Sequence, residues 1–184
     1  MLRQLSKIKY AREREREREK MFAKRSLHIY TNGSCLNNGK LFARGGIGLY
    51  FPNNEYQNLS IPYPQNKLII PPTNQRCELL AVNYSLLIHW LYFRDTQCVI
   101  HTDSEYTVKS LTSYCNTWLQ NGWKKANNED VKNKDLLQPM HVLFAKNKNV
   151  DFHIVKDSGN ILDRHSLNHR IAHAFARKGL GFRS

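Results

Sequence analysis

The residues His28-Ile-Tyr-Thr-Asn-Gly-Ser34, followed after two glycines by Ile47-Gly-Leu-Tyr-Phe51, decide the fold. Each run sets β-branched and aromatic residues, which favour strands, beside turn-forming residues. Residues 28–31 are therefore predicted as a strand that closes at Asn32, and residues 47–51 as a second strand. A turn signal at Asn53 and Asn54 leads into a third short strand at residues 56–61. These three strands predict an antiparallel meander.

Helical periodicity begins after a proline-rich loop. From Cys77 to Leu91 apolar residues recur every three or four positions, and Thr73 or Asn74 can cap the helix. The remaining elements are predicted as a strand at 97–101, a helix at 103–114, a helix from about 135, a strand at 150–155 and a helix at about 163–178. This order predicts an α/β domain whose five-stranded mixed sheet has three antiparallel strands, then parallel ones, with helices on its faces.

The charge balance indicates a polyanionic partner. The chain of 184 residues carries 28 Lys and Arg against 15 Asp and Glu, a net charge of +13. Such an excess is typical of nucleic-acid-binding proteins, although a basic protein without such a partner is the simpler alternative. No apolar run approaches the roughly 20 residues of a membrane span, so no membrane partner is expected. Four widely spaced cysteines predict reduced thiols rather than disulfides or a zinc site.

Residues 1–26 differ in composition from residues 27–184, which are predicted as one domain. The first segment holds an alternating Arg-Glu run without an apolar face, and its ten basic and four acidic residues give it a charge of +6. Arg-rich leaders favour mitochondrial import, whereas the four glutamates argue against it. A nuclear or RNA-contacting tail is the alternative, and an intracellular location, mitochondrial before nuclear, is expected.

Three positions at strand ends and helix starts are suited to metal chemistry. They are Asn32, Glu78 and Asp103, of which two are carboxylates and one is a neutral amide. Two-metal phosphodiester hydrolysis needs several carboxylates that converge on ions about 4 Å apart. Hard cations such as Mg²⁺ prefer oxygen ligands. The sequence therefore predicts a metal site in which one charge is missing.

Four ordered motifs resemble the type 1 ribonuclease H family, over about residues 27–179. They are Ile29-Tyr-Thr-Asn-Gly-Ser-Cys35, Thr73-Asn-Gln-Arg-Cys-Glu-Leu-Leu80, His101-Thr-Asp-Ser-Glu-Tyr106 and the segment from Asn121-Gly-Trp-Lys to Asn133-Lys-Asp-Leu136. The resemblance implies a ribonuclease H-like fold. It also implies Mg²⁺ held by four carboxylates and cleavage of the RNA strand of RNA–DNA hybrids.

Position by position, the resemblance implies a degenerate catalytic site. Glu78 and Asp103 keep two of the family's carboxylates, but Asn32 stands where the first is expected. The fourth falls on His173 or, in another alignment, on Ala172. The family's mobile histidine is missing from Val155-Lys-Asp-Ser-Gly159. Because metal affinity follows the charge of the ligands, weak or absent metal binding and an inactive site are expected. The alternative is that Asp157 or Asp163 substitutes as a ligand and that the protein is an active, Mg²⁺-dependent enzyme.

The resemblance implies a better preserved surface for nucleic acid. Asn38 matches a residue that touches the RNA strand, and Thr73 with Gln75 matches a pocket for a DNA phosphate. The residues that match a basic protrusion gripping the DNA strand are Trp118, Trp123, Lys124, Lys125, Lys132 and Asn133. Aromatic and basic residues together suit sugar and phosphate contacts, although core packing is the alternative for the two tryptophans.

His165, His169 and His173 share one face of the last predicted helix, away from an apolar stripe of Leu167, Ile171, Ala174 and Phe175. This spacing can ligate zinc, but an exposed polar face that meets RNA is the favoured interpretation.

Three functions therefore remain open. The first is an inactive ribonuclease H-like protein that binds an RNA–DNA hybrid or structured RNA. The second is an active hybrid-cleaving enzyme. The third, compatible with the first, is a structural subunit of a large RNA–protein assembly such as a mitochondrial ribosome.

Overall fold

The computed structural model describes residues 26–181 except 41, 65–69, 157–159 and 161. The charged extension, apart from its last residue, and Asp157 lie outside these described residues. The strands are β1 (Leu27–Leu36), β2 (Arg44–Tyr50), β3 (Leu59–Pro62), β4 (Cys98–Thr102) and β5 (Val150–Ile154). The helices are α2 (Asn74–Ile88), α3 (Glu105–Lys109), α4 (Cys115–Gln120), α5 (Lys134–Lys146) and α6 (Arg164–Gly179).

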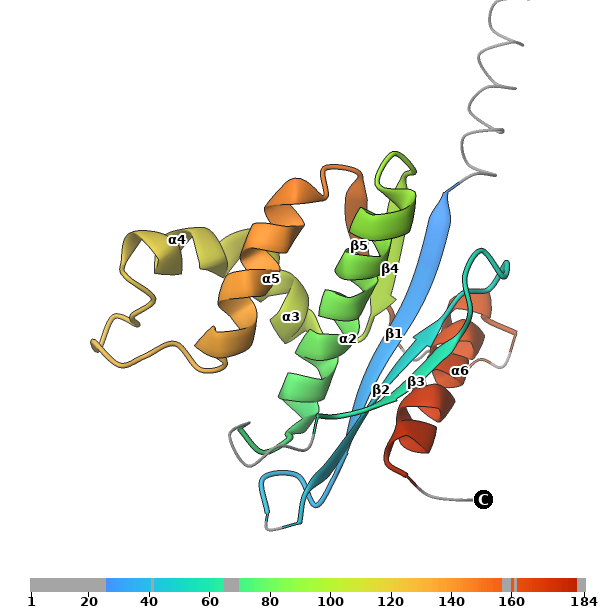
Figure 1. Ribbon diagram of the computed structural model, residues 1–184, viewed down its shortest axis with the longest axis horizontal. Coiled ribbons are helices and arrows are strands. Elements are labelled where there is room, and N and C mark those ends of the chain that lie inside the picture. The colour runs from blue at the N-terminus through green and yellow to red at the C-terminus, as the bar shows by residue number, and fades with distance from the viewer. Residues whose placement is uncertain (1–25, 41, 65–69, 157–159, 161, 182–184) are drawn as a thin grey trace, which may run out of the picture.

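The five strands form one mixed sheet in the order β3-β2-β1-β4-β5 (Figure 1). β1 pairs antiparallel with β2, and β2 with β3, whereas β1–β4 and β4–β5 are parallel. The predicted sheet is therefore confirmed. Wide π-helical turns, His89–Phe93 after α2 and Ser110–Tyr114 between α3 and α4, extend the helices. Trp118 consequently lies in α4, a helix beyond the predicted helix end at residue 114.

The first strand does not close at Asn32 as predicted, because β1 continues to Leu36 and pairs with β2 along its whole second half. The glycine after Asn32 reflects close packing and not a turn. A Cβ on Gly33 would lie 2.2 Å from the backbone nitrogen of Glu78 in α2. The helix thus approaches the strand so closely that only glycine fits, and Asn32 lies inside the sheet.

The last helix packs through small residues. α6 covers one face of the sheet, and α2, α3, α4 and α5 lie on the other side (Figure 1). A Cβ on Gly48 would lie 2.1 Å from the carbonyl oxygen of Ala172, and Gly46 meets Ala176 in the same way. The apolar stripe predicted for this helix is therefore not its packed face, and Leu167 on that stripe is 48% exposed.

The main hydrophobic core lies between the sheet and the helices α2 and α5, and includes Ile29, Leu79, Ile100 and Met140. Three of the four cysteines are buried and Cys35 is partly buried, all as free thiols. Within the described residues, no helix is both long enough and apolar enough to cross a membrane.

Candidate metal centre and nucleic-acid interface

Three elements bring the predicted metal-site residues together. Asn32 lies in β1, Asp103 follows β4, and Glu78 lies in the first half of α2. The amide nitrogen of Gly33 donates to Glu78 Oε1 at 2.8 Å, which holds this carboxylate against β1. Because β1 and β4 are parallel neighbours with Tyr30 paired to His101, Asn32 and Asp103 lie at matching positions two residues further along, and His169 contacts both.

The two carboxylates have opposite electrostatic surroundings. Burial raises the pKa of Glu78 well above its ordinary value, and the negative charge of Asp103 raises it further, against the Gly33 hydrogen bond. Burial also acts to raise the pKa of Asp103. The neighbouring His169, with a smaller effect of His173, outweighs burial and leaves the Asp103 pKa below its usual value. Without a cation, the site therefore favours an ionised Asp103 and a protonated Glu78.

The oxygens left over at this site fit a cation. Asn32 Oδ1 and Glu78 Oε2 are buried and receive no hydrogen bond within the described part of the chain. Burying an acceptor without a donor costs free energy, and a bound ion or water at the acceptor removes this cost. With the half-exposed Asp103 they form an all-oxygen donor set of the kind that Mg²⁺ prefers. Asn32, Glu78 and Asp103 would hold the ion, which would supply charge stabilisation to a phosphodiester.

A histidine occupies the side of the site that faces α6. His169 Nε2 lies 3.6 Å from Asp103 Oδ1 and 3.5 Å from Asn32 Nδ2. His173 is one turn further along, where burial and then the charges of Arg177 and His169 lower its pKa against the pull of Asp103. Ala172 is fully buried and meets β2. The α6 residue that contacts Asp103 is therefore His169, and neither alignment placed this residue at the fourth carboxylate position.

Asp163, considered above as a substitute ligand, has a structural role. It is the N-cap of α6, and its carboxylate accepts hydrogen bonds from the backbone nitrogens of His165 and Ser166 and from the Ser166 hydroxyl. A carboxylate committed to these donors stabilises the helix start. The other substitute considered, Asp157, lies outside the described residues.

We expect Glu78→Gln to stabilise the metal-free protein by about 1–2 kcal/mol at pH 7.5, because Gln is neutral in both states whereas Glu78 is ionised in the unfolded chain and has to take up a proton when the protein folds. The raised folded-state pKa of Glu78 means that its stability contribution is complete below about pH 4.5, the ordinary value, and is lost as the pH rises. The gain from Gln should therefore vanish near pH 4. Urea unfolding in EDTA measures it.

The control for this variant is Glu129→Gln, which removes an exposed carboxylate paired with Lys125. It should change stability by no more than about 0.5 kcal/mol. A Glu78→Gln protein less stable than the natural chain at pH 7.5 would show that the Glu78 carboxylate is stabilised as an anion.

Thr73 and Asn38, two of the residues predicted to contact nucleic acid, also have structural roles near the start of α2. Thr73 caps α2, with its hydroxyl accepting from the Arg76 nitrogen at 3.2 Å. Asn38 is exposed, and its Oδ1 accepts from the Asn74 nitrogen at 3.1 Å, which joins the β1–β2 turn to α2. Gln75 is exposed and follows them. Asn38 and Gln75 are both accessible to a ligand, so the RNA contact of Asn38 and the phosphate contact of Gln75 stay predictions.

The segment between α4 and α5 is partly structural. Trp123 is only 5% exposed and Trp118 packs against the same core, with ring centroids 6.3 Å apart. Asn133 is also buried. Its Oδ1 accepts from Arg76 Nη1 and its Nδ2 donates to the Tyr106 hydroxyl, each at 3.3 Å. Trp123 and Asn133 therefore have structural roles in the fold, and their contact with nucleic acid stays a prediction. Core packing, the alternative considered for the tryptophans, accounts for Trp123.

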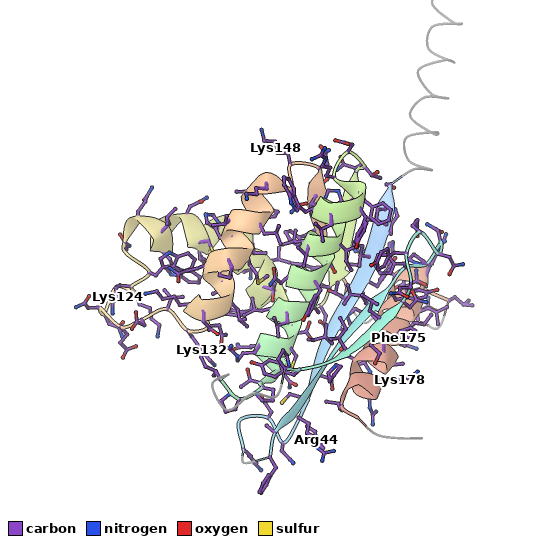
Figure 2. The ribbon with its side chains drawn as sticks, viewed as in Figure 1. Arg44, Lys124, Lys132, Lys148, Phe175 and Lys178 are labelled. Atoms are coloured by element: carbon purple, nitrogen blue, oxygen red, sulfur yellow. The ribbon has the colours of Figure 1, made fainter. Side chains whose placement is uncertain are left out.

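The lysines of this segment are accessible. Figure 2 shows Lys124 towards the outer end of the α4–α5 connection and Lys132 where the connection returns to α5. Lys124 pairs with Asp130 and Lys125 with Glu129, each at 3.1 Å. Lys132 is exposed and has no ion pair among the described residues. It is therefore the lysine of the segment most available to a phosphate.

Sequence reasoning missed an ion pair, made by a buried arginine, behind this segment. The Arg76 guanidinium, 3% exposed, binds both carboxylate oxygens of Asp135, with Nη1 at 2.9 Å from Oδ1. Its Nε also donates to the Tyr63 hydroxyl at 2.9 Å. This network fixes the start of α5 to α2. The signal available in the sequence was the position of Arg76, next to Cys77 at the start of the apolar helical pattern.

The chain matches the family model described as RNase H over residues 24–173. It is 33% identical over 132 residues to a probable ribonuclease H of Acanthamoeba polyphaga mimivirus, and 35% identical over 136 residues to a ribonuclease H of Schizosaccharomyces pombe. These matches cover 71% and 72% of this chain but 56% and 48% of the relatives. The chain thus spans about half the length of these two proteins.

A solved structure supports the same fold. The foamy viral protease–reverse transcriptase in complex with an RNA/DNA hybrid aligns over 86% of this chain and 20% of its own, with a TM-score of 0.65 and 18% identity. At this identity the likeness concerns the fold alone.

Proposed function

The chain belongs to the ribonuclease H family, and from that premise we propose that it binds nucleic-acid duplexes, RNA–DNA hybrids first, with little or no cleavage. One observation carries the second half of the proposal. The neutral Asn32 and the imidazole of His169 lie beside Asp103, where a two-metal site needs carboxylates.

The charge at the site explains why cleavage should be weak. Only Asp103 is readily ionised, since the surroundings of Glu78 favour its protonated form. A divalent ion must therefore drive the proton from Glu78 before it gains a second negative ligand. His169, whose Nε2 lies 3.6 Å from Asp103 Oδ1, competes with a cation for this carboxylate. Both effects lower the affinity for Mg²⁺, and a second ion would find too few anionic ligands.

The binding half rests on the accessible polar and basic groups and on the relatives. Lys132, Lys125, Asn38 and Gln75 are exposed, and the whole chain carries a charge of +13. The foamy viral neighbour was solved with an RNA/DNA hybrid. Backbone phosphates supply most of the affinity in such complexes, and this part of binding does not depend on a complete metal site.

Binding is tested with Lys132→Ala and a labelled hybrid. We expect about a three- to tenfold weaker affinity, and a slope of log K against log salt that is smaller by about one, because one phosphate contact is lost. Lys148→Ala is the matched control, since this exposed lysine lies beyond the other end of α5 (Figure 2) and should leave both quantities unchanged. Absence of affinity for hybrid and for double-stranded RNA would contradict the proposal.

The second candidate is an active hybrid nuclease that requires Mg²⁺ or Mn²⁺. The observation that favours it is the pair of unpartnered oxygens, Asn32 Oδ1 and Glu78 Oε2, which suit a cation. Cleavage of the hybrid by the natural chain, removed by Asp103→Asn, would establish this function in place of the first.

The basic charge also supports a role in a large RNA–protein assembly, with the mitochondrial ribosome as the first candidate and the mitochondrion before the nucleus as location. Sedimentation of the native protein in a gradient tests this proposal. A protein found only in the light fractions would rule the assembly out.

A further inference from the structure

Four histidines and a tyrosine gather next to, but apart from, the carboxylate site. Tyr30, His101 and His153 are register partners across β1, β4 and β5, so their side chains form one row. His165 of α6 lies over this row, with its ring centroid 5.1 Å from that of His101 and 4.9 Å from that of His153. Packing against the sheet does not explain this cluster, since His153 and His165 are exposed.

We propose that His101, His153 and His165 bind a divalent transition-metal ion of the Zn²⁺ type. One ring nitrogen of each lies within 4.8 Å of the other two, and the Nδ1 atoms of His101 and His153 are 3.1 Å apart. Nitrogens bound tetrahedrally to zinc at about 2.0–2.1 Å lie about 3.3 Å from each other. Only a small movement of the exposed His165 and His153 would complete this geometry.

The second nitrogens of two of these rings already have partners. His101 Nε2 lies 2.9 Å from His28 Nδ1, and His28 Nε2 in turn lies 3.0 Å from the Ser26 hydroxyl. His165 Nδ1 lies 2.8 Å from the Tyr30 hydroxyl. These contacts leave Nδ1 of His101 and Nε2 of His165 for the ion. Outer partners of this kind orient zinc-bound histidines and fix which nitrogen carries the proton.

The donor set selects the class of metal. Three imidazoles and no carboxylate suit Zn²⁺, Ni²⁺ or Cu²⁺ and not Mg²⁺, which prefers oxygen. His101 is 2% exposed, whereas His153 and His165 are exposed, so the site is closed on the sheet side and open to solvent on the other. A pocket lined by His28, Tyr30, Glu55 and His165 reaches it. Water would therefore complete the coordination.

The ion would join three separate segments of the chain. His101 lies in β4, His153 in the edge strand β5, and His165 in the first turn of α6. His169, which contacts Asp103, follows one turn later on the same helix. A metal bound here would hold the start of α6 on the sheet, and would thereby stabilise the fold independently of the carboxylate site.

The proposal is tested on the full chain, freed of metal with EDTA and titrated with Zn²⁺ by calorimetry, and with Co²⁺ by visible absorption. We expect one ion per chain, the intense visible bands of a tetrahedral Co²⁺ site and a higher melting temperature. His153→Ala should weaken binding by more than the roughly 10–100-fold that loss of an outer partner costs. His165→Gln provides a second variant and should do the same.

Two controls separate this site from others. His141→Ala removes a histidine of α5, which lies on the other side of the sheet, and Asp103→Asn removes the retained carboxylate. Both should bind Zn²⁺ like the natural chain. The proposal is overturned if no ion binds, if binding survives His153→Ala and His165→Gln unchanged, or if Asp103→Asn alone abolishes it. Melting in EDTA shows whether each variant is folded.

Discussion

The Asn32→Asp variant is expected to cleave the RNA strand of an RNA–DNA hybrid at least about a hundredfold faster than the natural chain in Mg²⁺, because residues of one catalytic unit act together. The physical reason is the charge of the donor set. Asn32 Oδ1 already lies buried without a donor at the site, so the exchange changes the charge and hardly the shape. The added carboxylate supplies an anionic ligand beside Asp103, and metal affinity follows ligand charge.

Recovery should remain partial, since His169 still lies 3.6 Å from Asp103. Initial rates with a strand-labelled hybrid, over a Mg²⁺ and a Mn²⁺ series, measure the gain. The double variant Asn32→Asp with Asp103→Asn is the control and should return to background. If Asn32→Asp cleaves no faster at any metal concentration while it binds the hybrid normally, His169 and not the missing charge of Asn32 limits the site.

The second large effect is on stability. We expect Arg76→Met to lower the free energy of unfolding by about 3 kcal/mol, because removal of the buried arginine from a partly buried ion pair leaves its partners without their donor. Arg76 is almost fully buried, and its guanidinium donates hydrogen bonds to Asp135, Asn133 and the Tyr63 hydroxyl. Methionine fills much of the space but donates no hydrogen bond. The expected loss of stability lies at the lower end of the range for removing one partner of an ion pair, since the Asp135 side chain is 44% exposed and can be hydrated.

Urea unfolding of Arg76→Met beside Lys134→Met measures this difference. Lys134 makes an exposed pair with Asp130 at 3.4 Å in the same region, and its loss should cost at most about 1 kcal/mol. Adding Asp135→Asn to Arg76→Met should recover part of the stability, because the unpaired charge is removed. Equal losses in the Arg76 and Lys134 variants would show that the buried network contributes no more than a surface pair.

Most of the architecture was predictable because it depends on local pattern. The periodicity of residues 77–91 and the alternation at residues 150–155 give helix and strand without knowledge of their neighbours. Gly33 shows where local pattern misleads. The same residue signals a turn in sequence and a close approach of α2 in the structure. The apolar stripe of α6 misleads in the same way, since glycines of β2 select small residues for the contact.

By itself the sequence determined the family, the mixed sheet and the types of the candidate site residues, because strand and helix periods and the identity of residues 32, 78 and 103 follow directly from the chain. Only the tertiary structure decided which groups meet. It put His169 beside Asp103 and His165 over His101, and it buried Trp123 in the core and Asn133 in the Arg76 network. Strand register and helix docking set these contacts over separations of many residues, and no local pattern encodes such distances.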